Sequence, residues 1–432
     1  MRNLEECAHV FEGLLKECPV DHYAFSLSES ESQELNLENG EFTLLRTVQG
    51  NGISLKLISQ GRIGTSSGTD LSDEGLQQMI ADARASLESA TPDPMWDIAP
   101  DQGKDSFSKG CDHLDLDRLF SRTAELKQNI EQEYPLIRLM LLIVSQVSAR
   151  KLYRNSNGTA FDSQYKVYSV SLEFSAGEGD KTTGIDSVGF LTDDLSIPFI
   201  DQASVRQHLA NTSRRISASA FDGKFTGTVI FTPECLTQFI SMLLGNYVSD
   251  GVILDGTSLW LDKIGERVAS PVLTVSNRPS DPRIVMGESW TGDGFRTEDI
   301  VIIDHGILKT HLLSLYVSRK TGRPVTRNTD SALIIEPGEA SIESIIQETE
   351  KGLIVGDFSG GSPGTNGDFS GVAKNAFLIE NGRISRAVNE TMISGNLGAI
   401  FSNIRAISRE TVEDGGTVMP YMAVDGIVVS GK

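Results

Sequence analysis

Two histidines in the C-terminal half lie closer together in sequence than any others among the six of the chain. His305 and His311 stand in the segment DHGILKTHLL, directly after Asp304. On a β-strand, side chains an even number of residues apart lie on the same face, and imidazole and carboxylate groups are ligands for zinc. The segment is therefore a candidate metal site, and two surface histidines at a turn are the alternative interpretation.

A glycine-rich run, GDFSGGSPGTNGDFSG, covers residues 356–371 and contains the motif GDFSG twice. A phosphate-binding loop would need a lysine after its last glycine, which this run lacks, and its two aspartates would repel a phosphate. The run favours a structural pair of glycine turns. The functional alternative is a loop or strand edge that binds peptide, because glycine lets a second backbone approach closely. The candidate peptide-binding residues are Gly367, Asp368, Phe369 and Ser370.

A helix is predicted for TPECLTQFISMLLGNYV, residues 232–248. Thr232 can cap its N-terminus, and Pro233 suits the first helical position, where an N–H would have no partner. One face is an apolar stripe with helical spacing, made of Leu236, Phe239, Ile240, Leu243, Leu244 and Tyr247. The opposite face carries no strong acid, base or metal ligand; it consists of Gln238, Ser241, Met242, Gly245 and Asn246.

The elements that would position these residues form an α+β chain rather than a regular alternation. The first 90 or so residues read as helix, antiparallel strands and helix, with tight turns at the Asn-Gly pairs 39–40 and 51–52 and at Gln60-Gly61. Two long strands flank a further Asn-Gly pair at 157–158. We expect a mixed N-terminal region, 1–222, with sub-parts 1–92 and 106–222, and a β-rich domain, 223–432. Helices are also expected near 310–320, 341–350 and 396–403.

The composition excludes several classes of partner. A net charge of −21 disfavours a nucleic-acid backbone or an anionic membrane surface, since both need a basic protein. The four cysteines form no C-x-x-C pair, which suits a reducing compartment. The N-terminus lacks the pattern of a signal peptide, and no run of about 18 apolar residues is present. We therefore expect a cytoplasmic protein that binds neither nucleic acid nor membrane.

Several blocks of the sequence resemble the TldD/PmbA family, which is historically labelled as modulators of DNA gyrase and associated with peptide-degrading metalloproteases. They include LDGTSLWLDKIGERVASPVLTV (254–275) and GDFSGVAKNAFLIENGRI (367–384), together with residues 293–322 and 388–404. Residues 39–72 are similar to the opening domain of the family. The blocks follow one another in the expected order over nearly the whole chain.

The resemblance implies a branch of the family. TldD-like members carry a zinc helix, H-E-x-x-x-H, and a distal cysteine ligand, whereas PmbA-like members lack these groups and pair with a TldD-like subunit. Counted back from Gly256, the zinc helix falls on Ser241 to Asn246, so Ser241, Met242 and Asn246 occupy the places of its two histidines and glutamate. The last cysteine is Cys235, so a distal thiolate is missing as well. The chain is identified as PmbA-like, with no metal of its own.

The function implied by this branch is a non-catalytic subunit of a zinc peptidase. Zinc is expected only in a TldD-like partner, the substrates are short or unfolded peptides, and the chain alone is expected to form a homodimer. Two alternatives stay open. One is a peptide-binding or regulatory protein that needs no catalytic partner. The other is a self-contained peptidase with an unrecognised site, built around His305, His311 and nearby carboxylates.

Overall fold

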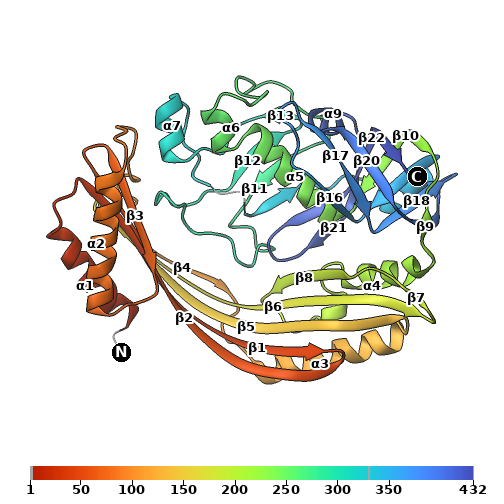
Figure 1. Cartoon of the computed structure of the whole chain (residues 1–432), viewed down its shortest axis with the longest axis horizontal. Helices are drawn as coiled ribbons and strands as arrows, with labels where there is room; N and C mark the ends of the chain where they lie inside the picture. Colours follow the sequence, from red (N-terminus) through yellow and green to blue (C-terminus); the bar gives the residue numbers. More distant parts are fainter. Residues whose placement is uncertain (1–2, 329–330, 432) are drawn as a thin grey trace.

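The computed structural model describes residues 3–328 and 331–431, and two β-sheets carry the fold within them (Figure 1). The first is a long curved sheet that lies beneath the C-terminal half of the molecule in this view. Its strands, in spatial order, are β3 (Arg62–Gly68), β2 (Glu41–Ser59), β1 (His22–Glu38), β5 (Ile137–Asn155), β6 (Ala160–Glu178) and β4 (Lys104–Gly110), with β7 (Lys181–Thr182) and β8 (Asp186–Thr192) also paired to β6.

Tight turns with left-handed residues produce the hairpins of this sheet. Asn39 and Gly40 join β1 to β2 with φ of 51° and 83°, and Gly158 turns between β5 and β6 with φ of 105°. Both hairpins are predicted correctly, as is the turn at Gln60-Gly61. The prediction of a turn at residues 51–52 is wrong. Strand β2 continues through that Asn-Gly pair and stays paired with β1. Cross-strand pairing on a long neighbour overrides the local turn preference there.

Helices cover one face of the long sheet at its two ends. They are α1 (Leu4–Lys16) and α2 (Asp73–Ser89) at one end, and α3 (Leu116–Glu133) and α4 (Val205–Arg214) at the other, with the short turns η1 (Phe199–Asp201) and η2 (Arg215–Ser217). Phe25 and Leu27 of β1 pack under α1, and Leu35 and Leu37 pack under α3. These four positions share one parity along the strand, so both helical layers lie on the same face.

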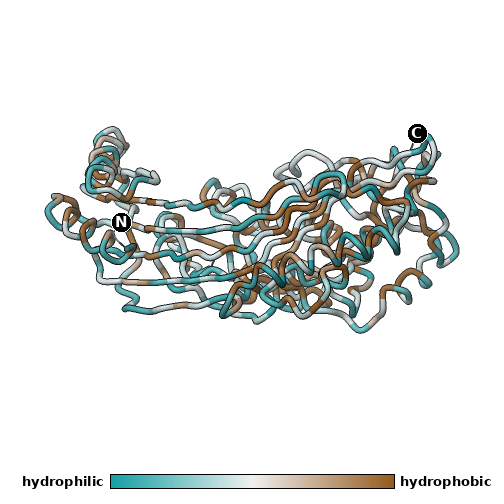
Figure 2. Tube along the Cα trace, turned by 90° about the horizontal axis from the view of Figure 1, so that it is seen from below, coloured by the Kyte–Doolittle hydropathy of each residue, from teal (hydrophilic) through white to brown (hydrophobic). Residues whose placement is uncertain are grey.

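The long strands run most of the length of the molecule (Figure 2). β1 pairs with β5 as well as with β2, so residues 22–68 and 137–192 belong to one sheet. The expected sub-parts 1–92 and 106–222 therefore share that sheet. The connecting segment between them is an ordered loop: the Trp96 ring stacks on Tyr316 at 3.8 Å, and Tyr316 Oη donates to Asp93.

The second sheet holds the C-terminal half and is rich in short strands, which confirms the expected α+β class. Its main path is β13 (Ile307–Leu308), β12 (Ile300–Asp304), β11 (Val275–Asn277), β14 (Leu333–Ile335), β22 (Val418–Ser430), β10 (Lys224–Phe231), β15 (Lys351–Val355), β18 (Ala376–Glu380), β19 (Arg383–Asn389) and β9 (Ser219–Ala220). A branch of three strands joins it at β22, namely β16 (Asp357–Gly360), β17 (Asp368–Lys374) and β20 (Thr391–Asn396), and β21 (Ile404–Glu413) also pairs with β22.

The helices of this half are mostly short. They are α5 (Pro233–Tyr247), α6 (Asp250–Leu254), α7 (Leu315–Thr321), α8 (Ile342–Gln347) and α9 (Leu397–Ser402). The last three lie where helices are expected, although α7 begins five residues later than the predicted start at residue 310. Strand β8 ends at Thr192 and β9 begins at Ser219, and the expected domain boundary at residues 222–223 stays a prediction. No helix of the described residues is both long and apolar enough to cross a membrane.

Candidate functional site around helix α5

Helix α5 forms as its sequence predicts. Thr232 has an extended backbone, and its hydroxyl accepts from the N–H of Cys235, while Pro233 fills the first helical position. The backbone N–H of Val248 closes the last turn on Leu244. Both ends lie within one residue of the predicted span, because the capping residues act locally.

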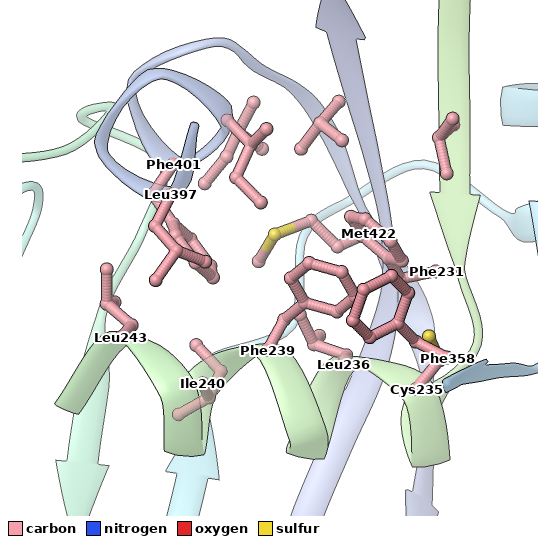
Figure 3. Packing of buried hydrophobic residues seen from close by; sticks show 14 of the residues in the cluster. Phe231, Cys235, Leu236, Phe239, Ile240, Leu243, Phe358, Leu397, Phe401 and Met422 are labelled. Atoms are coloured by element: carbon pink, nitrogen blue, oxygen red, sulfur yellow. The ribbon is translucent and has the colours of Figure 1, made fainter. Parts of the chain in front are cut away.

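The apolar stripe of α5 is fully enclosed in the largest core cluster (Figure 3). Phe239 is central: its ring centroid lies 4.3 Å from that of Phe231 and 5.2 Å from those of Phe358 and Phe369. Tyr247 stacks on Trp260 at 4.5 Å. Burying a phenylalanine-sized side chain stabilises the fold by about 1.5–3 kcal/mol, so this face explains why the helix is there.

The outer face of α5 does not fit a zinc ion. Ser241 is exposed, while Met242 and Asn246 are half-buried. Zinc in proteins is held by imidazole, thiolate or carboxylate groups, and these three positions offer a hydroxyl, a thioether and an amide. The amide nitrogen of Asn246 has no hydrogen-bond partner within the described part of the chain. The donor set is therefore wrong for the metal that the family resemblance would place here.

Cys235 cannot supply the missing thiolate. Its side chain is fully buried in the core beneath α5, and burial raises the pKa of its thiol well above the ordinary value. Across residues 3–328 and 331–431, no group of three or more histidine, cysteine, aspartate or glutamate side chains is placed so that it could hold a metal ion.

The repeated GDFSG motif forms two adjacent strands rather than the expected pair of glycine turns. β16 and β17 pair antiparallel, with Gly360 opposite Gly371. A Cβ at either glycine would lie 2.5–2.6 Å from the tip of the Phe358 ring. The glycines thus leave room for that ring, and the two repeats place Phe358 and Phe369 against Phe239 of α5 and against each other, with 5.8 Å between the ring centroids of Phe358 and Phe369.

The structure therefore brings the glycine-rich run alongside α5. Gln238 of the helix donates to Asp357 at 2.7 Å and accepts from the N–H of Phe358 at 3.3 Å. A Cβ at Gly367 would lie 2.2 Å from Tyr247 Oη. Of the four candidate peptide-binding residues, Asp368 and Ser370 are exposed, whereas Gly367 and Phe369 are buried. The Phe369 side chain belongs to the core, so it is not free to contact a peptide.

His305 and His311 do not share a face. His305 lies in the turn between β12 and β13 with φ of 47°, and its Nδ1 lies 2.7 Å from Asp304 on an exposed surface. His311 is buried, and its Nε2 lies 3.1 Å from the carbonyl of Trp260. Burial lowers the pKa of His311. The prediction that both histidines lie on one strand face is wrong, because the turn at His305 interrupts the strand. The alternative of two surface histidines is also wrong for His311, which is buried.

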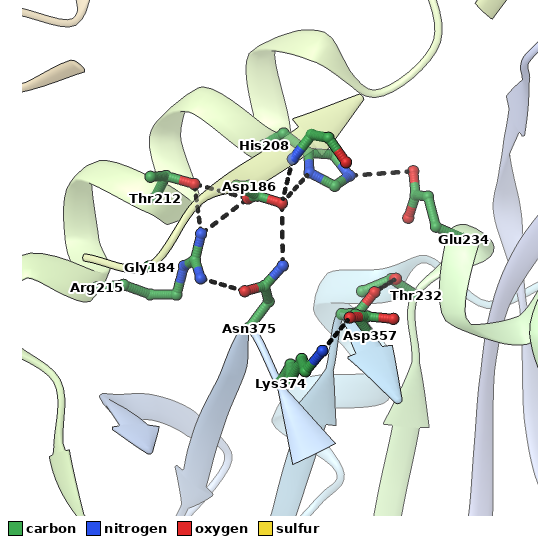
Figure 4. A network of polar contacts seen from close by, with 12 residues as sticks. Gly184, Asp186, His208, Thr212, Arg215, Thr232, Glu234, Asp357, Lys374 and Asn375 are labelled. Atoms are coloured by element: carbon green, nitrogen blue, oxygen red, sulfur yellow. Dashed lines mark hydrogen bonds and ion pairs between the residues drawn. The ribbon is translucent and has the colours of Figure 1, made fainter. Parts of the chain in front are cut away.

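A polar network that the sequence does not reveal joins α5 to the long sheet (Figure 4). His208 of α4 lies between two carboxylates: Nδ1 is 3.4 Å from Asp186 of β8, and Nε2 is 3.5 Å from Glu234 in the first turn of α5. Arg215 donates to Asp186 at 2.8 Å and also bonds Asn375, whose own amide donates to Asp186 at 3.0 Å.

The electrostatics of this network favour a charged histidine. Burial alone would lower the pKa of His208, but the contacts with Asp186 and Glu234 raise it to about 10. Burial alone would raise the pKa of Glu234, yet His208 lowers it to about 2. The His208 side chain is 13% exposed and that of Glu234 is 34% exposed. The group acts as an ionic tie between the two sheets. Its members come from β8, α4, η2 and α5 and from the turn between β17 and β18, so no motif in the sequence predicts it.

Comparison with known proteins identifies the fold and the class. A family model described as the PmbA/TldA metallopeptidase C-terminal domain matches residues 223–431, and one described as domain 1 of the same metallopeptidases matches residues 23–87. The crystal structure of TldE from Thermococcus kodakarensis superposes with a TM-score of 0.85 at 20% sequence identity, covering 98% of this chain and 100% of that chain. The fold and the models thus define a metallopeptidase-type protein.

Two curated relatives show how much of the chain is matched. The metalloprotease PmbA of Escherichia coli O157:H7 is 26% identical over 424 residues, which cover 90% of this chain and 88% of that protein. A zinc metalloprotease TldD homolog of Saccharolobus solfataricus is 26% identical over 260 residues, covering 56% of this chain and 57% of that protein. The chain belongs to the PmbA/TldD family of metallopeptidases.

Proposed function

We propose that this chain is a non-catalytic subunit that works with a TldD-like, zinc-bearing partner to cleave short or unfolded peptides in the cytoplasm. The observation that supports the proposal is the difference between the two faces of α5. Its inner face is buried as completely as any part of the core. Its outer face holds Ser241, Met242 and Asn246 where a TldD-like chain would hold its ligands and base.

Zinc would supply an activated water and polarise the scissile carbonyl, and residues 3–328 and 331–431 contain no group of side chains placed to hold it. The role left to the chain is to shape the peptide site of the pair. Asp368 and Ser370 are exposed on β17, close to α5, and Asp368 is held by the amides of Asn366 and Asn396 at 2.7 and 2.9 Å. A carboxylate fixed in this way can accept hydrogen bonds from the backbone of an extended peptide.

Metal content tests the first half of the proposal. The purified full chain is dialysed against trace zinc and measured by elemental analysis, beside a TldD-like protein treated identically. We expect far less than one zinc per chain here and about one per chain in the TldD-like control, because tetrahedral zinc sites need three or four strong ligands. About one tightly held zinc in this chain would overturn the non-catalytic assignment.

A cleavage assay tests the second half. A fluorogenic unstructured peptide is offered to this chain, to a TldD-like subunit from the same cytoplasm, to the mixture, and to the mixture with a chelator. We expect turnover that needs the mixture and is abolished by the chelator. A Ser370→Lys variant should weaken turnover by the mixture, while Met392→Lys on the neighbouring strand serves as the matched exposed control. A TldD-like subunit that is equally active without this chain would refute the subunit role.

The two other functions predict different results in the same assay. A regulatory or peptide-binding protein would bind peptide without changing the activity of any TldD-like subunit. A self-contained peptidase would turn over peptide alone. Its suggested site is not favoured, because His311 is buried against Trp260 whereas His305 is exposed in a turn beside Asp304.

A further inference from the structure

The face of the long sheet that carries the helices becomes polar between its two helical layers. Helices α1 and α2 lie at one end of the sheet and α3 lies at the other (Figure 1). Leu27 of β1 packs under α1, and Leu35 packs under α3. Between them, at the same strand parity, β1 carries Glu29, Glu31 and Gln33. The same face is therefore apolar beneath the helices and polar in the gap that separates them.

A hollow of about 620 Å³ spans four strands in this gap, and we call it the central hollow. Strand pairing sets two rows of side chains across it, because residues directly opposite one another share a face. One row consists of Gln49 of β2, Glu31 of β1, Ser148 of β5 and Lys166 of β6. The row beside it, nearer α1, consists of Asn51, Glu29, Arg150 and Gln164 on the same four strands. All eight residues line the central hollow.

The central hollow faces away from the C-terminal half of the chain. A neighbouring hollow shares Arg150 with it and is also lined by Glu5 of α1, which places both on the side of the sheet that carries the helices. Tyr153 of β5 has the opposite strand parity and lies against Trp290 of the C-terminal half. The long sheet therefore separates the central hollow from α5 and from the exposed residues of β17.

Charges of both signs line the central hollow, and the two signs lie on different strands. Glu29 and Glu31 are exposed on β1, whereas Arg150 lies one strand further on and Lys166 lies two strands further on. These four charges cancel, although the whole chain carries −21. A purely anionic ligand would be repelled by the glutamates and a purely cationic one by Arg150 and Lys166. A ligand that carries one charge of each sign at its two ends matches the arrangement.

The charged groups keep hydrogen-bonding capacity for such a ligand. Arg150 donates to Asp162 at 3.1 and 2.7 Å, which uses only part of its planar donor set. Lys166 Nζ donates to a backbone carbonyl at 2.6 Å, and an ammonium group carries further N–H donors. Glu31 accepts from Gln49 at 2.7 Å through one of its two oxygens. Each side of the central hollow can therefore still bind a group of opposite charge.

The spacing of the charges fits a short peptide. Glu31 and Lys166 belong to one row two strands apart, so their backbones are about 10 Å apart. An extended peptide spans about 3.3–3.6 Å per residue, and only the small Ser148 lies between the two charges in that row. We propose that the central hollow binds free peptides of two or three residues, with the ammonium group at Glu29 and Glu31 and the carboxylate at Arg150 and Lys166.

This site goes beyond the proposed subunit role. Free peptides of this size are the chemical class that peptide hydrolysis releases, so the hollow would let the chain sense or retain such products. Binding there needs neither zinc nor a TldD-like partner, because every group that it uses belongs to the long sheet.

Triglycine is the probe for this site, because it carries both end charges and no side chains. The full chain is titrated and binding is followed by ligand-observed NMR. We expect saturable binding in the millimolar range. N-acetyl-triglycine, which lacks the ammonium group, and triglycine amide, which lacks the carboxylate, should each bind about tenfold more weakly, because each loses a hydrogen bond between charged groups.

Substitutions in the hollow assign each preference to its residues. A Glu29→Gln, Glu31→Gln double variant should bind triglycine and N-acetyl-triglycine alike, because the carboxylates that recognise the ammonium group are gone. Lys166→Gln should reduce the preference for triglycine over its amide. The matched control is a Glu38→Gln, Glu41→Gln double variant, which removes two exposed carboxylates at the end of the β1–β2 hairpin outside the hollow. It should keep both preferences.

Several results would overturn the proposal. They are the absence of saturable binding to the natural chain, equal binding of the three probes, and preferences that the hollow variants leave unchanged or that the control variant also removes. Maltotriose that binds as tightly as triglycine would show recognition of uncharged polar chains and would equally refute the assignment. The titration contains no partner and no zinc, so failure of the mixture assay leaves its outcome unaffected and the two proposals fail separately.

Discussion

Replacing His208 by glutamine tests whether the ion pairs that join α4 to β8 and α5 stabilise the protein in the way that the raised pKa of His208 implies. In the native chain the charged imidazole sits between Asp186 and Glu234, and both ring nitrogens face carboxylates. Glutamine fills similar space without a charge. In the variant, Asp186 keeps its hydrogen bonds from Arg215 and Asn375, whereas Glu234 loses its charged partner. Removing one member of a buried ion pair typically costs about 3–5 kcal/mol.

The pH dependence follows from the direction of the shift. The pKa of His208 is raised from 6.5 to about 10 in the folded protein. Its stabilisation is therefore fully present below the unfolded pKa of 6.5 and is lost as the pH rises through about 10. With these two values, the free energy of unfolding should lose about 3 kcal/mol of the His208 contribution between about pH 6 and about pH 9.

The assay is urea unfolding of the natural chain and of His208→Gln at several values between those limits. Tyrosine, lysine and cysteine groups also titrate in this range, so the informative quantity is the difference between the two proteins at each pH. That difference should be largest at the acid end and should shrink as the pH rises. His113→Gln, at an exposed histidine before α3, is the matched control. A difference that does not change with pH would refute the charged assignment of His208.

Three further outcomes are expected. Phe239→Ala should lower the free energy of unfolding by about 3–5 kcal/mol, measured by urea unfolding, because the ring is fully buried among three other phenylalanines; a loss below about 1 kcal/mol would contradict this packing. Gly367→Ala should lower the thermal midpoint, since φ is +87° and the added Cβ would lie 2.2 Å from Tyr247 Oη, whereas Gly361→Ala has open space and should be neutral. The buried Cys235 thiol should resist an alkylating reagent until denaturant is added, as read by mass spectrometry; labelling in the native state would show that its core opens.

The parts of the fold predicted correctly from sequence are those governed by local chemistry. The cap at Thr232 and the stripe through Phe239 define α5 without reference to any neighbour. The left-handed turns at Gly40 and Gly158 likewise fix their hairpins. The same logic is wrong at residues 51–52, because a long partner strand imposes its own geometry on a pair that prefers to turn. The repeated GDFSG motif is misjudged for a similar reason: its glycines make room for a ring that only the tertiary structure brings near.

The polar part of the candidate site is hidden from sequence for a different reason. His208 belongs to an unremarkable helical segment, and its partners stand 22 residues before it and 26 residues after it in the chain. No motif links such positions, since the contacts arise only when α4, β8 and α5 pack together. The non-ligand character of Ser241, Met242 and Asn246 is visible in sequence, because the chemistry of a side chain does not depend on the fold.

Because α5 is buried on one side and exposed on the other, its two faces are expected to differ in how freely their residues change during evolution. The stability of the helix comes from its buried stripe, whereas Ser241 and Gly245 on the other side are exposed, and a Cβ at Gly245 would meet nothing within 4 Å. Substitutions at such sites usually change stability by less than about 0.5 kcal/mol. Selection on the fold therefore exerts little restraint on the outer positions, and side chains there can be exchanged by drift one at a time. A lineage can lose or acquire reactive groups along this helix while its architecture stays unaltered.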